Sequence, residues 1–460
     1  MIRASIERCA GIDVGKQWLS VTLMVGPLEG EPRQEQRRFG TIRAELVKLR
    51  EWLQLEGITH VVMESTGSYW KPVFNELEGS VQVYLANPNE VKIRKGHKTD
   101  DKDGWWLAHL LRHAMIQPSF IPPRAIRELR DLTRYRKKLL SNGTAERNRV
   151  HKVLEDANVK LDIVLSDLFG VSGQLMLNAL LKGEEAPQQI AQHAQRRAKS
   201  KIPEIIASLE GHQMNDHHRR MIHYHLDHMK ILEEQIAKVD QDIEEQIQRA
   251  GLDKQWQLLQ SVPGVQQTSA ATILAEVGSS MKPFATQRNL SSWAGVCPGN
   301  NRSAGRNKGS RTSKGNKWLK SALTEISWGA ANKKGCFLKH KFWRVKTKSK
   351  GKDGPALVAV AHTLLILIYQ VISTGQPYQE RGIPELDEKQ KDRAIRHHMR
   401  RLGKLGIEAC SPRSATGVTG STRPCRIAAR EKKSRPNRKQ ADAPIRGEKV
   451  SRGRPKKQKN

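Results

Sequence analysis

The chain has 460 residues, 37% of them apolar, and its formal net charge is +33. This length predicts two or three domains, and so large an excess of Lys and Arg predicts a polyanionic partner, with nucleic acid favoured over a membrane surface. No apolar run approaches the length of a membrane span and no signal-peptide core is present, so we expect a cytoplasmic, nucleoid-associated protein with no membrane partner. The five cysteines lack CxxC spacing, which argues against structural zinc.

The N-terminal segment alternates short β-type runs with helical patterns. Residues 10–25 give two such runs broken at Gly15, Lys16 and Gln17, as in a hairpin, and a third run lies near 38–41. A helix at 45–55, a strand at 59–63, a helix at 70–77, a strand at 81–86 and a helix opening near Thr99 are expected next. This order predicts a mixed sheet with helices on its faces, in an α/β domain over residues 1–117.

Two long helices are predicted in the middle of the chain. One begins near Arg124, with apolar positions at Leu129, Leu132, Leu139 and Leu140, and the other covers residues 218–250 with apolar residues three and four apart. The second pattern is typical of a coiled coil, and it leaves open whether the stripe pairs two subunits or packs within one chain. We expect this helical, coiled-coil region to cover residues 118–253.

The remainder is predicted to be mainly helical and then polar. A domain at 254–376 carries a basic, glycine-rich interruption at 299–316, and a charged helix lies within 377–410. Residues 411–460 hold 16 Lys and Arg against three acidic residues, so we expect a disordered basic tail.

Four acidic residues of the first domain stand where their side chains could converge. Asp13 ends the strand-like AGID, Glu64 closes the apolar strand HVVME, and Asp100 and Asp103 lie three apart on one face of the predicted helix. Clustered carboxylates repel one another unless divalent cations lie between them, and hard oxygen ligands suit Mg²⁺. Two such ions can activate the attacking oxygen and stabilise the leaving oxygen of a phosphodiester. Taken singly, each acid could instead form a turn or cap a helix.

The stretch LLQSVPGVQQTSAATILAEVG, residues 258–278, predicts two helices joined by a Pro-Gly hairpin. Such a unit can offer backbone N–H groups to a DNA phosphate, but a plain turn between core helices is nearly as favoured. Gln266 weakens the first interpretation, because a second glycine would suit that position better.

The loop between Gly299 and Asn316 combines glycines, serines and cations. Glycines allow close approach of a nucleic-acid backbone, and cations neutralise its phosphates. A serine in such a loop could donate a hydrogen bond to phosphate, which the spacing alone favours, or attack phosphorus as a nucleophile. The residues predicted to bind nucleic acid here are Arg302, Arg306, Lys308, Arg311 and Lys314.

Five motifs, in this order, resemble those of the DEDD transposases of the IS110 insertion-sequence family: GIDVGKQ, VVMESTGSYW, NPNEVKIRKGHKTDDKDGWWLA, the 258–278 stretch and WAGVCPGNNRSAG with SKGNKWLKSAL. The resemblance covers residues 9–375. It departs from the family pattern at Ala304, which stands where a glycine commonly follows the serine, and at Gln266.

The resemblance implies an RNase H-like (RuvC-like) first domain, a coiled-coil linker and a C-terminal transposase domain. It assigns the four acidic places to Asp13, Glu64, Asp100 and Asp103, as Mg²⁺ ligands, and the catalytic serine to Ser303. It also implies DNA ends as substrates, a bridge RNA as guide, and a dimer or tetramer with composite sites.

Two rival functions stay open at this point. A RuvC-like junction-resolving nuclease would use the four carboxylates and water, without the serine. A non-catalytic nucleic-acid-binding protein would need the charge alone.

Overall fold

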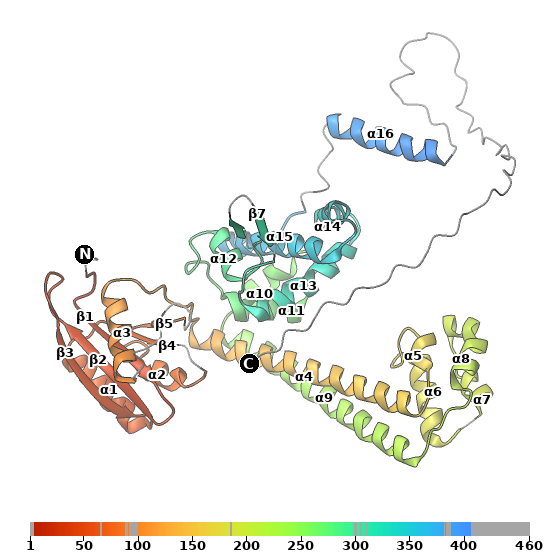
Figure 1. Ribbon diagram of the computed structural model, residues 1–460, viewed down its shortest axis with the longest axis horizontal. Coiled ribbons are helices and arrows are strands. Elements are labelled where there is room, and N and C mark those ends of the chain that lie inside the picture. Colours follow the sequence, from red (N-terminus) through yellow and green to blue (C-terminus); the bar gives the residue numbers. More distant parts are fainter. Residues whose placement is uncertain are drawn as a thin grey trace, which may run out of the picture. The chain divides into compact units, whose positions relative to one another are not determined.

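A computed structural model (Figure 1) describes residues 4–64, 67–87, 91, 100–184, 186–298, 301–303, 306–309, 311–380, 382 and 388–405. Of residues 100–102, 301–303, 306–309, 388–394 and 404, the backbone alone is described. The described residues up to 382 and those from 388 to 405 belong to two separate units.

A five-stranded mixed sheet opens the first unit, as predicted. Its strands are β1 (Arg8–Val14), β2 (Trp18–Val25), β3 (Arg33–Gly40), β4 (His60–Glu64) and β5 (Gln82–Ala86), in the spatial order β3-β2-β1-β4-β5. β1 is antiparallel to β2 and parallel to β4, which is parallel to β5. β3 begins earlier than the sequence suggested, because its RQEQRR segment is a mostly exposed edge strand without apolar alternation.

Helices cover both faces of this sheet (Figure 1). α1 (Arg43–Leu55) and α2 (Trp70–Leu77) share one apolar cluster with Ile12 and Met63, whereas α3 (Asp100–Arg112) shares another with Cys9 and Val62. Because side chains alternate along a strand, residues 9, 11 and 13 of β1 and residues 62 and 64 of β4 point to the α3 face. We call the part from β1 to α3 the sheet domain.

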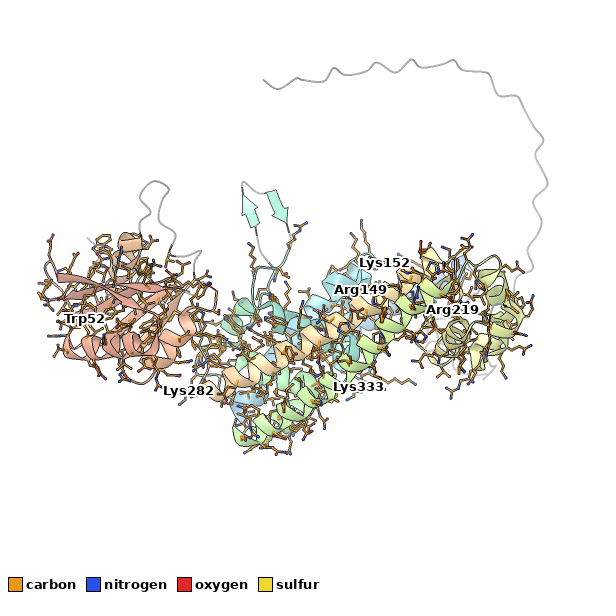
Figure 2. The ribbon with its side chains drawn as sticks, turned by 90° about the horizontal axis from the view of Figure 1, so that it is seen from below. Trp52, Arg149, Lys152, Arg219, Lys282 and Lys333 are labelled. Carbon is orange, nitrogen blue, oxygen red and sulfur yellow. The ribbon has the colours of Figure 1, made fainter. Side chains whose placement is uncertain are left out.

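α4 (Arg124–Asp156) and α9 (Asp216–Arg249) lie side by side, and Figure 2 labels Arg149 and Lys152 on the first of them. They run antiparallel, since Gln246 contacts Ala125 near one end and His225 contacts Glu146 towards the other. The apolar stripe of α9 is buried against α4 and its neighbours, which supports packing within one chain over a seam between subunits. Leu140, expected in the apolar set, is 39% exposed.

A small helical bundle that the sequence did not predict lies between these two long helices in the chain. It consists of α5 (Leu161–Val164), α6 (Val171–Lys182), α7 (Pro187–Gln192), a 3₁₀ helix (Arg196–Lys201) and α8 (Ile202–Leu209). Its core is separate and includes Val150, Leu154 and Ile222 from α4 and α9. The helices are short, so no single apolar period extends far enough to be recognised.

The C-terminal helical domain comprises α10 (Asp253–Gln260), α11 (Gln267–Val277), α12 (Gln287–Trp293), α13 (Lys317–Asn332), α14 (Phe337–Lys348) and α15 (Asp353–Thr374), with a hairpin of β6 (Asn301–Ser303) and β7 (Arg306–Gly309). α15 corrects one expectation, because by length and composition it is apolar enough to cross a membrane. It packs against α10, α12, α13 and α14 in the largest apolar cluster, as the central helix of a folded core does.

The second unit contributes one described helix, α16 (Glu388–Lys404), where a charged helix was predicted. The predicted basic tail at 411–460 lies outside the described residues, and the boundaries at 117, 253, 376 and 410 stay predictions.

Candidate active site

Asp13 and Glu64 lie at the same edge of the sheet. Ile12 is the register partner of Met63 on the parallel strands β1 and β4, and the two acidic residues are the next along each strand. Both belong to the alternating set that points to the α3 face, and both are half-buried. The structure therefore brings these two predicted residues together on neighbouring strand ends.

Gly11 of β1 and Gly104 of α3 allow the helix to pack directly against the strand. A Cβ added to Gly11 would lie 2.2 Å from the carbonyl oxygen of Gly104 and 2.4 Å from the nitrogen of Ala108. Further back along the strand, the Cys9 thiol donates to the Ala108 carbonyl at 3.7 Å, so the helix runs antiparallel to β1. Asp103 immediately precedes Gly104, so this contact sets its position on the side of Asp13 and Glu64.

Asp100 opens α3 one turn before Asp103, but its side chain lies outside the described residues, as does that of Asp101. Within the part of the chain that the structure describes, no group of three or more His, Cys, Asp or Glu side chains has metal-binding geometry. The acidic residues placed so far offer only carboxylate oxygens, which is the donor chemistry that Mg²⁺ takes. By chemistry, this edge of the sheet fits a hard divalent ion.

Ser303 ends β6, where its backbone pairs with Arg306 of β7. The side chains of Ser303, Arg302, Arg306 and Lys308 lie outside the described residues, as do Ala304 and Gly305 altogether. Two other members of the predicted nucleic-acid set, Arg311 and Lys314, are exposed to solvent.

The base of the loop that carries Ser303 is closed by backbone contacts. A Cβ on Gly315 would lie 2.4 Å from the nitrogen of Gly295, whose φ of +71° is itself a conformation that favours glycine. Pro298 and Thr312 form an antiparallel bridge just above this contact, and the Asn316 amide donates to the Trp293 carbonyl at 3.2 Å. Backbone contacts therefore hold the two ends of the loop together.

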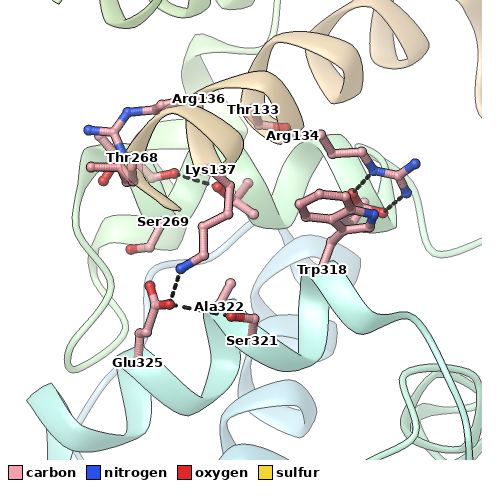
Figure 3. Close-up of a pocket in the computed structure, with 13 residues that line it drawn as sticks. Thr133, Arg134, Arg136, Lys137, Thr268, Ser269, Trp318, Ser321, Ala322 and Glu325 are labelled. Carbon is pink, nitrogen blue, oxygen red and sulfur yellow. Dashed lines mark hydrogen bonds and ion pairs between the residues drawn. The ribbon is translucent and has the colours of Figure 1, made fainter. Parts of the chain in front are cut away.

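A buried charge network, which the sequence did not predict, ties this loop base to α4. Glu276 of α11 is fully buried, and Arg134 Nε and Nη2 donate to its two carboxylate oxygens at 2.7 and 2.9 Å (Figure 3). The Asn316 side-chain amide donates to the same carboxylate at 2.6 Å. Arg130 donates to the carbonyls of Ala275 and Glu276 at 2.8 and 2.9 Å, which satisfies the C-terminal end of α11.

Glu276 and Arg134 border a small pocket between α4, α11 and α13, with a volume of about 80 Å³. Hydroxyl groups line much of it, and Figure 3 shows Lys137 reaching Glu325 and Arg134 beside Trp318. Because these cations pair with acidic side chains of the chain itself, we interpret the pocket as a joint between α4 and the C-terminal helical domain. The only sequence signal was a lone acid in the apolar segment ATILAEV.

The Pro-Gly hairpin between α10 and α11 packs inward. Gly264 has a φ of +85°, and a Cβ there would lie 2.7 Å from the Ile326 carbonyl of α13. Gln266 has a φ of −115°, so this position has no need of glycine, and the Ser269 hydroxyl accepts its backbone N–H at 2.8 Å. The expectation that a glycine would suit position 266 better was wrong, and the packing of Gly264 on α13 supports the role of a turn between core helices.

Two family models match the chain, one over its N-terminal part and one over the C-terminal helical domain. Residues 10–159 match a family model for DEDD transposases of the IS110 type, described as a transposase. Residues 256–341 match the model described as the transposase IS116/IS110/IS902 family. No curated protein matches the chain. The first match includes the four acidic residues and the second includes Ser303 with its basic loop, so the chain belongs to the IS110 family of transposases and is an enzyme that acts on DNA.

Proposed function

We propose that the protein is a site-specific DNA recombinase of an insertion sequence, whose RNase H-like sheet domain holds Mg²⁺ and whose Ser303 attacks DNA. Asp13, Glu64, Asp100 and Asp103 would be the metal ligands. The observation that carries the proposal is the meeting of Asp13 and Glu64 at one sheet edge, on the face to which α3 presents Asp103.

When bound, divalent ions supply Lewis-acid stabilisation of the oxygens around the phosphorus. The chain's own part begins with the basic loop, whose cations Arg311 and Lys314 attract the phosphate of the strand to be cut. The Ser303 oxygen forms a bond to phosphorus while the bond from phosphorus to one sugar oxygen breaks. The hydroxyl proton passes to solvent, and the leaving sugar oxygen takes up a proton.

This step balances without any redox partner and without ATP, because one phosphodiester bond replaces another. The rejoining step is the reverse of cleavage. A sugar hydroxyl attacks the serine-linked phosphorus, and the bond from phosphorus to Ser303 breaks, which restores the Ser303 hydroxyl. We further propose that a bridge RNA selects the DNA sites, and that a dimer or tetramer brings two DNA ends together. The high positive charge fits two polyanionic partners at once.

The rival enzyme function is a junction-resolving nuclease that uses the same carboxylates with water as nucleophile. Nothing in the sheet domain distinguishes the two, since both need metal at the same edge. The difference lies in the C-terminal helical domain, where only the recombinase has a role for Ser303.

The test follows strand cleavage and the covalent protein–DNA adduct on denaturing gels, with Mg²⁺, element-end DNA and the RNA that copurifies with the protein. Ser303→Ala should lose the adduct, and Asp103→Asn should lose both adduct and cleavage. Asp101→Asn is the matched control, because it removes a neighbouring acid of the same helix, and it should leave both intact. Continued cutting by Ser303→Ala would favour the nuclease, and an unaltered Asp103→Asn enzyme would rule out both metal-dependent functions.

A further inference from the structure

A strongly basic surface with two exposed tryptophans lies on α13 and α14. In the sequence, these helices follow the loop that carries Ser303. Residues 331–352 contain nine Lys and Arg and no Asp or Glu. Figure 2 labels Lys333 at the start of this segment. The family match ends at residue 341, so the second half of the segment follows the part that the family model matches.

Trp343 and Trp328 are the aromatic part of this surface. They are 51% and 44% exposed, although large aromatic side chains usually bury most of their area. The buried Phe342 ring lies between them, with its centroid 5.7 Å from that of Trp343 and 5.8 Å from that of Trp328. The two tryptophans therefore belong to one fixed aromatic patch instead of two independent surface residues.

Cations surround the patch. Lys339 lies one helical turn before Trp343 and Lys346 one turn after it, with Nζ 5.0 Å from the Trp343 ring centroid. Arg344 and Lys348 are exposed on the same helix. Among the residues that the structure describes, the acidic side chains in contact with this helix include Asp353, through Lys346, and Glu380, through the amide of Phe337, so a large positive excess is left.

We propose that this surface, Trp328, Lys339, Trp343, Arg344, Lys346 and Lys348, binds unpaired RNA, with a base stacked on Trp343 and phosphates on the flanking cations. Aromatic platforms edged by Lys and Arg bind single-stranded nucleic acid, because a base stacks on the ring while its backbone is neutralised. The proposal deepens the proposed function, on which it rests for the presence of an RNA partner.

Other occupants fit the chemistry less well. A second copy of the same surface would bring two sets of cations together, which is repulsive. Duplex DNA, the substrate of a transposase, would use the cations but leave Trp343 without a base, since its bases are stacked inside the helix. RNA loops display unstacked bases as their ordinary state, so RNA is the occupant that uses both halves of the surface.

The experiment measures binding of the full-length protein to a short unstructured oligoribonucleotide, to the same sequence as single-stranded DNA, and to duplex DNA, by fluorescence anisotropy. Trp343→Ala should weaken RNA binding about ten-fold, whereas Trp343→Phe should keep most of the affinity because the smaller ring still stacks. Affinity for duplex DNA should be unchanged. Tyr224→Ala, which removes a 66% exposed aromatic ring from α9, is the matched control and should have no effect.

The cations are tested through salt. Lys339→Gln together with Lys348→Gln should lower the slope of log affinity against log salt for RNA by about 1.4, since each phosphate contact on a single strand contributes about 0.7. Lys238→Gln on the exposed side of α9 is the matched charge control and should leave the slope unchanged.

The assignment to RNA is overturned if Trp343→Ala leaves RNA affinity unchanged, weakens single-stranded and duplex DNA equally, or alters only the oligomeric state. Failure of the proposed function looks different, because it is measured by the Ser303 adduct on DNA. If the wild type forms the adduct and Trp343→Ala binds RNA with unaltered affinity, only the RNA-binding surface is refuted. If the wild type forms no adduct, the proposed recombinase function is refuted.

Discussion

The sheet domain and the C-terminal helical domain hold their predicted catalytic residues in different ways. In the sheet domain, Gly11 of β1 and Gly104 of α3 bring two backbones into direct contact, and Asp103 takes its place from that contact. In the C-terminal helical domain, the loop base also has a glycine pair, but the anchor to α4 is the buried Glu276 carboxylate with its arginine and asparagine partners.

The difference matters because the glycine contact and the buried charge network respond differently to substitution. A backbone contact tolerates no added atom, but it needs no charge and is insensitive to salt. A buried carboxylate tolerates small shifts, yet it becomes destabilising as soon as one partner is lost, because an uncompensated charge stays behind. Substitutions at the glycine contact and in the charge network should therefore have different effects on the free energy of unfolding and on the rate of strand cleavage.

The largest effect is expected at the charge network. Glu276→Ala leaves Arg134 and Arg130 without their carboxylate, and such a loss typically costs about 3–5 kcal/mol of unfolding free energy. Chemical denaturation should show the loss, and hydrogen exchange should place it in α11 and at the α4 contact. Glu325→Ala is the matched control from the same pocket: its side chain is 62% exposed, so breaking its ion pair with Lys137 should cost less than about 1 kcal/mol. Equal effects for the two variants would show that the network does not anchor the domain.

The next effect is expected at the glycine contact. Gly11→Ala forces α3 away from β1, because the new methyl group would overlap the Gly104 carbonyl. Overpacking of this kind costs about 1–3 kcal/mol. A displacement of about one ångström at Asp103 should slow strand cleavage about 100-fold, so activity falls more than stability does. Cleavage rates and melting temperatures measured side by side check the prediction.

Gly143 of α4 supplies the control for that substitution. A Cβ there meets nothing within 4 Å, so Gly143→Ala should stabilise the helix by about 0.5–1 kcal/mol and leave cleavage unchanged. If Gly11→Ala behaved in the same way, α3 would not depend on the glycine contact for its position.

Parts of this comparison could be predicted from the sequence, and parts could not. The meeting of Asp13 and Glu64 at one sheet edge could be predicted, because each lies at or next to the end of an apolar strand and the local strand pattern carries that information. The Glu276 network could not be predicted, because Arg134 lies 142 residues away and no local pattern links the two. Ser303 came from the family resemblance alone, since the residues around it predict only a basic loop.

The smallest effect tests α3 through pH. Burial, together with the positive charge of His113 and Arg112, holds the pKa of His109 below its usual range. The folded state therefore binds this proton more weakly than the unfolded chain, so the stability it contributes is present above the unfolded pKa of about 6.5 and is lost as pH falls through the folded pKa.

Hydrogen exchange of the α3 amides should accordingly quicken as the pH falls below the unfolded pKa of about 6.5, after correction for the intrinsic pH dependence of exchange. The Trp105 ring stacks on His109 with centroids 5.2 Å apart, so near-ultraviolet circular dichroism should follow the same change. His109→Gln, which cannot take up a proton, should flatten the response of α3. It should leave that of α15 in place, because His362 there also has a lowered pKa, through burial and Lys341. A response of α3 that survives His109→Gln would show that another titrating group is responsible.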